Sequence, residues 1–230
     1  MNIDDPVIVQ LREQVKAAQD VFDMAVTLHE VWKPAANDTD LHKRLGKSYA
    51  TQAFNVVRVA LRRETILALM RLWDRDPRAI SMPAIAETVA DAAVLEVFVH
   101  DRVTRLGISG AEDDVRRTLS ERVEAIKALT DAYGKEGAKA ASLDTLRALR
   151  NQRLAHAQVK ARAFTETDAI DDIVEVFYQD NARLVSGLLS VVSAVAYDPV
   201  ETGDVYRFYA KFFWASVHGE RFYKEPDANG

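Results

Sequence analysis

The chain has 230 residues, enough to bury a core without help from disulfides or structural metals. With 48% hydrophobic and 28% charged residues but only 9 Gly and 6 Pro, its composition favours a soluble, all-helical fold. A net charge of -5 excludes a global basic field for nucleic acid or membranes, and the lack of cysteine excludes disulfides, thiolate chemistry and Cys-based zinc sites.

Two long helices are expected at the start of the chain. Apolar residues recur at helical spacing from Pro6, and proline interrupts a helix, so we predict a first helix at about 6–33 that ends before Pro34. A second run of apolar residues predicts a helix at about 40–73, loosened around Gly46.

The middle of the chain predicts two further helices and a connection. Ser81 stands where an N-cap is expected, and apolar spacing carries that helix to Gly107, with a break near Asp91. The next helix is predicted at about 109–134, with acidic residues in its first turn, where the helix dipole favours negative charge. The segment 135–141 is predicted to be a loop or hinge.

The last part of the chain predicts a polar helix, a long apolar helix and an aromatic tail. Ser142 is expected to cap the polar helix, which runs towards His156. A further helix is predicted at about 167–197, ended by a proline at 199. The aromatic residues of 204–222 are too many to be left in water, so we expect them to dock on the bundle or on a second subunit.

These elements predict an antiparallel helical bundle and a single domain over residues 1–230, with 200–230 as an aromatic-rich C-terminal extension. The N-terminus lacks the build of a signal peptide, and the longest uncharged run, Leu184 to Tyr197, has 14 residues, too few to cross a bilayer. We therefore expect a cytoplasmic protein without a membrane partner.

Motifs for metals and cofactors are missing from the sequence. It contains no Gly-rich phosphate loop, no His-Glu-x-x-His and no Glu-x-x-His. The acid clusters at 113–114 and 168–172 fall in the first turns of predicted helices, which favours a role opposite the helix dipole over metal binding. We therefore predict no cofactor and no metal.

One cluster stands apart from the rest of the chain. Residues six apart on a helix differ by about 120° around the axis and about 9 Å along it, so its Arg150 and His156 do not share one face of a regular helix. Without further information, the arginines are as well explained by solvation or by pairing with acids, and the histidine by a position at a helix C-terminus. Six polar residues make up the cluster, within ten positions of the sequence: Arg147, Arg150, Asn151, Gln152, Arg153 and His156.

Arg150-Asn151, four residues and His156 resemble the Arg-x4-6-His motif of HEPN domains, which include many metal-independent RNA endonucleases. The flanking Arg-Asn-x-Arg-x-Ala-His sequence and the earlier 69–74 segment, Leu-Met-Arg-Leu-Trp-Asp, are similar to the AbiU2-like branch. The resemblance covers about residues 1–200. It implies a four-helix core with additional helices, and a homodimer whose two motifs form one composite cleft.

The resemblance also implies roles for the motif residues. His156 would be the acid or base, Arg150 would hold the phosphate, and Asn151 would orient the histidine or the phosphate. Candidate RNA contacts, ranked lower, are Arg147, Gln152, Arg153 and Arg71.

We therefore predict a metal-independent endoribonuclease that acts as a toxin or phage-defence effector, with RNA as substrate and an antitoxin protein as a further partner. Some HEPN toxins carry a modified tyrosine two residues after the histidine, and Gln158 stands there in this chain, which argues against that route of control. The alternatives are a catalytically inactive HEPN-like binding or assembly module that uses the aromatic tail as its interface, and a helical protein unrelated to RNA.

Overall fold

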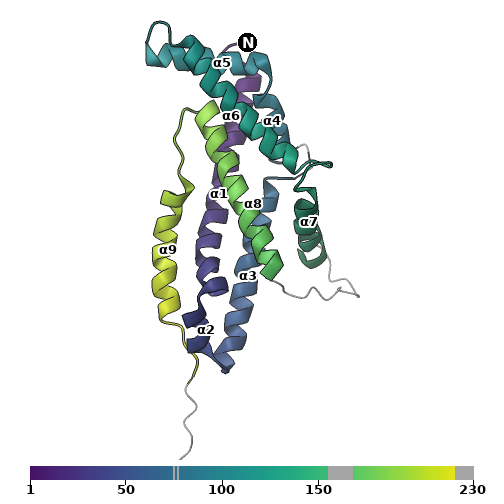
Figure 1. The fold of residues 1–230 in the computed structure, drawn as a ribbon, viewed down its shortest axis with the longest axis vertical. Coiled ribbons are helices and arrows are strands. Elements are labelled where there is room, and N and C mark those ends of the chain that lie inside the picture. The colour runs from purple at the N-terminus through teal and green to yellow at the C-terminus, as the bar shows by residue number, and fades with distance from the viewer. Residues whose placement is uncertain (75, 77, 155–167, 221–230) are drawn as a thin grey trace, which may run out of the picture. The chain divides into compact units, whose positions relative to one another are not determined.

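The computed structural model describes residues 1–74, 76, 78–154 and 168–220, and in these residues it contains helices and turns but no strand (Figure 1). The predicted all-α fold is confirmed, and the helices are consistent with a HEPN-like bundle. None of the described helices is long and apolar enough to cross a membrane. The described helices are α1 (Pro6–Asn37), α2 (Thr39–Leu45), α3 (Tyr49–Arg71), α4 (Met82–Val89), α5 (Ala92–Leu106), α6 (Glu112–Ala132), α7 (Ala140–Leu154), α8 (Asp168–Val192) and α9 (Pro199–Ala215).

The chain divides into two compact units. Unit 1 comprises Met1–Ala25 and Ile66–Pro199, and unit 2 comprises Val26–Thr65 and Val200–Gly230. Each unit therefore combines segments that are far apart in the sequence. The prediction that residues 1–230 form a single domain stays a prediction.

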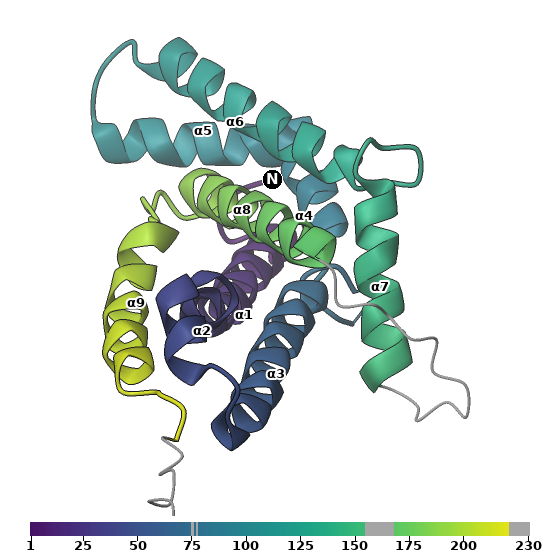
Figure 2. The same cartoon turned by 60° about the horizontal axis from the view of Figure 1, so that its bottom comes forward.

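In unit 1, α6 packs against α4, α5 and α8, and α5 and α6 lie side by side as a helical hairpin (Figures 1 and 2). The hairpin turn contains Gly107 and Gly110, both with positive φ, a conformation that glycine adopts without strain. The predicted break near Asp91 is confirmed: the Asp91 carboxylate accepts hydrogen bonds from the amides of Ala93 and Val94 and caps α5.

Unit 2 is built around a small aromatic core. Phe54 of α3 and Trp214 of α9 pack edge to face, with ring centroids 5.6 Å apart. The Trp214 indole donates to the carbonyl of Val31, which fixes α9 to the second part of α1. The predicted loosening at Gly46 is confirmed, because Gly46 adopts a φ of 54° between α2 and α3.

Two predicted helix boundaries are wrong, and a third is correct without the expected hydrogen bond. α1 does not end at Pro34 but runs through it to Asn37, where Ala35 is buried in the core of unit 2. Ser81 occupies the N-cap position of α4 as predicted, but its side chain makes no capping hydrogen bond, and the Met82 amide donates to the Leu72 carbonyl. Ser142 lies inside α7, which begins two residues earlier.

The boundary between α8 and α9 also differs from the prediction. α8 ends at Val192, where Ala194 adopts a φ of 58° and the Val195 amide bonds back to the Leu189 carbonyl. The apolar residues that continue beyond this point masked the end of the helix. Pro199 then begins α9, because a proline is well tolerated at the first position of a helix.

Candidate functional site

The polar cluster found in the sequence lies on α7, in unit 1. The helix buries one apolar side, because Leu143, Leu146 and Leu149 are 1%, 1% and 8% exposed. Arg147 and Arg150 are only partly buried and Asn151 is exposed, so this part of α7 presents its polar groups to solvent. The amphipathic character expected of this helix is therefore present.

Arg150 is held by two neighbours. Its Nη1 lies 3.5 Å from Oδ2 of Asp74, and the two side chains are 32% and 37% exposed. Its Nε donates to Oδ1 of Asn151 at 3.3 Å. The first two motif residues are thus in contact, and an acid beyond the end of α3 completes the group.

The position of Asp74 is fixed by Trp73, the residue before it. Trp73 is 3% exposed, and its indole Nε1 donates to Oδ1 of Asn181 on α8 at 2.8 Å. The amide of Asn181 in turn donates to the Phe177 carbonyl. Because this chain of hydrogen bonds is buried, the backbone that carries Asp74 is anchored to the core of unit 1.

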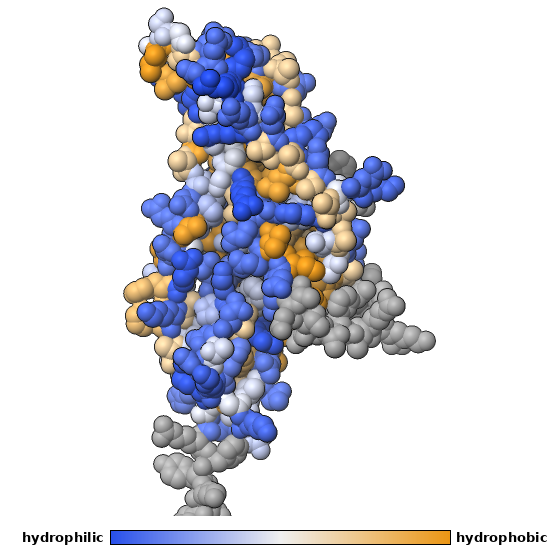
Figure 3. All heavy atoms as spheres, in the orientation of Figure 1, coloured by the Kyte–Doolittle hydropathy of each residue, from blue (hydrophilic) through white to orange (hydrophobic). Residues whose placement is uncertain are grey.

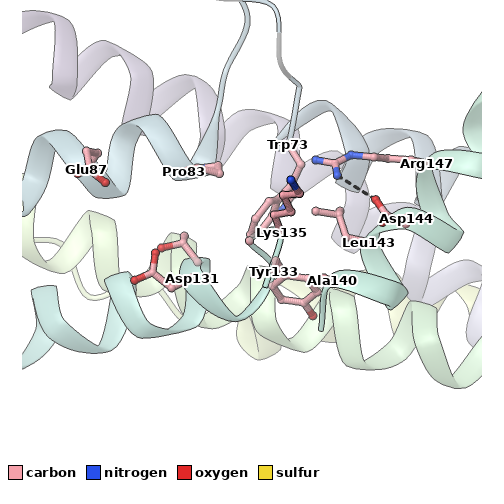
Figure 4. A pocket seen from close by; sticks show the side chains of 12 residues that line it. Trp73, Pro83, Glu87, Asp131, Tyr133, Lys135, Ala140, Leu143, Asp144 and Arg147 are labelled. Carbon is pink, nitrogen blue, oxygen red and sulfur yellow. Dashed lines mark hydrogen bonds and ion pairs between the residues drawn. The ribbon is translucent and has the colours of Figure 1, made fainter. Parts of the chain in front are cut away.

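A pocket of about 290 Å³ opens beside α7, and Arg147 lies on its rim (Figure 4). The Arg147 guanidinium contacts the Asp144 carboxylate at 3.3 Å. The buried residues of its wall are Trp73, Thr130, Tyr133 and Leu143. The figure shows Arg147 next to Trp73, with Glu87 and Asp131 farther along the opposite side.

A buried carboxylate on α8 bonds to Tyr133 in the pocket wall. Asp180 is 1% exposed, accepts a hydrogen bond from the Tyr133 hydroxyl at 2.7 Å, and pairs with Lys139 and, at 3.4 Å, with Arg183. Burial, together with the hydrogen bond to Asp180 and its negative charge, raises the pKa of Tyr133 well above its ordinary value. Tyr133 therefore stays protonated and donates to Asp180 at neutral pH.

The remaining predicted site residues divide into two groups. Arg71 is exposed in the last turn of α3. His156 and the side chains of Gln152 and Arg153 lie outside the described residues. The structure thus brings together Arg147, Arg150 and Asn151 on α7, and the other assignments stay predictions.

Sequence reasoning did not assign a role to Asp74, Trp73 or Tyr133. The segment 69–74 was noted only as similar to a family, and Tyr133 as the end of a helix. The described residues contain no group of three or more His, Asp or Glu side chains arranged to hold a metal ion. Glu112, Asp113 and Asp114 lie in the first turn of α6, where acids were expected to complement the helix dipole.

Comparison with known proteins identifies a family. A family model described as AbiU2, one of the HEPN models, matches residues 8–213. No curated protein and no solved structure matches the chain.

Proposed function

The chain belongs to the AbiU2 family of HEPN domains, and from that premise we propose that it is a metal-independent endoribonuclease acting as a toxin or phage-defence effector in the cytoplasm. Family membership gives the chain a HEPN-type role related to abortive infection. The observation that carries the further step to RNA cleavage is the contact between Arg150 and Asn151 on the solvent-facing side of α7. Four residues separate Asn151 from His156 in the sequence.

Cleavage of RNA without a metal uses the ribose itself. The 2′-oxygen attacks the adjacent phosphorus and the bond to the 5′-oxygen breaks, which leaves a 2′,3′-cyclic phosphate and a 5′-hydroxyl. One group must accept the 2′-hydroxyl proton and one must protonate the leaving oxygen, while a cation stabilises the charge that builds on the phosphorane. His156 has the side chain for proton transfer, and Arg150 has the planar guanidinium that binds phosphate oxygens in pairs.

The pairing of Arg150 with Asp74 fits this role. A half-exposed contact at 3.5 Å is a weak ion pair, so a phosphate can replace the carboxylate at the guanidinium. Before substrate binds, the Arg150 guanidinium contacts both Asp74 and Asn151.

We propose that the active form is a homodimer. The spacing of Arg150 and His156 would place them about 120° apart on a regular helix, so one copy of the motif would not present both to one phosphate. Two protomers that face each other would supply two arginines and two histidines to one cleft. An antitoxin protein that covers this cleft would be the natural inhibitor.

The test is cleavage of structured and single-stranded RNA by the purified protein in excess EDTA, beside DNA of the same sequence. We expect RNA cleavage that survives chelation and no DNA cleavage, because DNA lacks the 2′-hydroxyl. Arg150→Ala and His156→Ala should each lose about 100-fold or more of the rate.

Arg117→Ala is the matched control. In the wild type, Arg117 pairs with Asp114 at 2.7 Å on an exposed face of α6. The Arg117→Ala variant should cleave RNA like the wild type. Equal rates in wild type, Arg150→Ala and His156→Ala would remove the site assignment. A mass measurement in solution tests the dimer, and a strict monomer with full activity would contradict the composite cleft.

A second candidate function rests on α9. Four of its aromatic rings are 55–61% exposed in the structure, which suits a surface that binds another protein. Wild-type protein that cuts no RNA but assembles through α9 would favour an inactive HEPN-like binding module.

A further inference from the structure

We propose that the pocket beside α7 binds a nucleobase of the RNA, next to the phosphate that Arg150 holds. The proposal rests on the proposed function and adds a base-binding subsite to it. The pocket belongs entirely to unit 1, and its wall comes from the segment after α3, from α4, from the end of α6 and from α7.

Two residues of the pocket lie close in sequence to Arg150 or to its ion-pair partner Asp74. Arg147, on the rim, lies one helical turn before Arg150 on α7. Trp73, in the wall, is followed directly by Asp74, whose carboxylate contacts Arg150. A ligand in the pocket would therefore lie beside the phosphate site and not at a remote surface.

The size of the pocket suits a single flat ring system. Its volume of about 290 Å³ lies at the lower end of the range for small-molecule sites, about 300–1,000 Å³. A folded peptide segment would need more room. One base, turned out of a single strand, would fit.

The buried part of the wall is preformed and combines apolar surface with the Thr130 hydroxyl, which is bonded to the Ile126 carbonyl. Trp73, Tyr133 and Leu143 are at most 4% exposed, and the polar atoms of the two rings are already bonded to α8. The ring edges and the leucine thus offer an apolar contact that needs no rearrangement. Such contacts accept any base, since every base has an apolar face.

The charges on the rim favour a base over a phosphate inside the pocket. Three carboxylates line it: Glu87 and Asp131, which both pair with Lys127, and Asp144, which pairs with Arg147. Carboxylates repel an anion but accept hydrogen bonds from the amino and imino groups of bases. Lys135 and Arg147, also on the rim, would meet the backbone phosphates outside. Charge and shape therefore assign the pocket to the base and the rim cations to the backbone.

The test fills the pocket and measures binding directly, without relying on cleavage. Ala140 lines the pocket at the start of α7, whereas Ala141 is exposed and does not, so Ala140→Phe and Ala141→Phe place the same ring inside and outside the pocket. Equilibrium dialysis would measure binding of the four nucleoside monophosphates to the full chain, with ribose 5-phosphate as a probe that lacks the base.

We expect saturable binding of nucleoside monophosphates to wild type and Ala141→Phe, and binding weaker by about tenfold or more in Ala140→Phe. Ala140→Leu, a smaller filling group, should show an intermediate loss and replaces Ala140→Phe if that variant does not fold. Equal binding of ribose 5-phosphate, equal binding by the inside and outside variants, or no saturable binding to wild type would each overturn the proposal.

Cleavage assays separate this proposal from the proposed function. If wild type binds bases but cuts no RNA in EDTA, the proposed nuclease activity is contradicted and the proposed base-binding pocket is supported. If wild type cuts RNA and Ala140→Phe keeps the same rate and the same preference among cleavage positions as Ala141→Phe, the nuclease stands and the subsite is lost.

Discussion

Two of the groups of contacting aromatic rings in the described residues have opposite exposure. In unit 1, the Trp73 and Tyr133 ring centroids are 5.0 Å apart, Tyr133 and Phe177 are 5.3 Å apart, and all three rings are at most 4% exposed. In unit 2, the ring centroids of Phe208 and Phe212 on α9 are 4.8 Å apart, and the two side chains are 58% and 61% exposed. Figure 3 shows hydrophobic side chains on the surface where α9 lies.

The difference lies in what else the rings touch. Each polar ring atom of the unit 1 group has a partner on α8: Asn181 for the indole and Asp180 for the phenol. Buried Trp and Tyr need such partners, so their burial depends on a second helix that supplies them. Phe208 and Phe212 contact other rings of their own helix, and such contacts leave one side of each ring in water. Aromatic content alone therefore predicts neither burial nor stability.

The largest effect on stability is expected from removing a ring of the buried group in unit 1. Trp73→Ala should lower the free energy of unfolding by about 3–5 kcal/mol, because it removes a large buried side chain and leaves a cavity. Phe212→Ala removes a ring that is 61% exposed and should cost about 1 kcal/mol or less. Urea unfolding of both variants beside the wild type measures the difference, and equal losses would contradict the comparison.

A second, smaller effect isolates the polar partner. Asn181→Ala leaves the Trp73 indole without its acceptor in a buried place and should cost about 1–3 kcal/mol. Gln179→Ala, on the exposed side of the same helix, is the control and should change the free energy by no more than about 0.5 kcal/mol. In a Trp73→Phe background, which has no indole N–H, the cost of Asn181→Ala should fall. An unchanged cost would show that Asn181 does not act through Trp73.

The third effect is a pH dependence. Burial, the hydrogen bond to Asp180 and its charge raise the pKa of Tyr133, so the unfolded chain loses this proton first as pH rises. The stabilisation is complete below the ordinary tyrosine pKa of about 10 and is lost above it, at no more than about 1.4 kcal/mol per pH unit.

Urea unfolding of wild type and Tyr133→Phe from pH 8 to 11 checks this, and the variant should lose stability less steeply above pH 10. Tyr209→Phe removes the hydroxyl of a 61% exposed ring and should keep the wild-type dependence. Parallel curves for wild type and Tyr133→Phe would contradict the expectation.

The sequence predicted the helices better than their ends. Apolar spacing located the long helices and Asp91 located a break, because both signals are local. Pro34 misled, because α1 continues through it and buries Ala35 in the core of unit 2. A tertiary contact decided this end, and local signals do not contain it.

The candidate site was predictable only in part. The motif on α7 was visible as a string of polar residues, and the structure adds the contact of Arg150 with Asn151, whose roles stay predictions. The pairing of Arg150 with Asp74 joins residues 76 positions apart. Likewise, the pocket depends on how α4, α6 and α7 meet, which no spacing within one helix can reveal.

The smallest expected effect tests the exposed group. The double variant Phe208→Lys, Phe212→Lys places two charges where the rings are exposed, so the free energy of unfolding should change by about 1 kcal/mol or less. Trp214→Ala is the control on the same helix: its ring is 3% exposed and bonded to the Val31 carbonyl, so it should cost several times more. If the double lysine variant costs as much as Trp214→Ala, the α9 rings are buried in solution, against a second copy or another part of the chain. A mass measurement then decides between these two, because only loss of a dimer halves the mass.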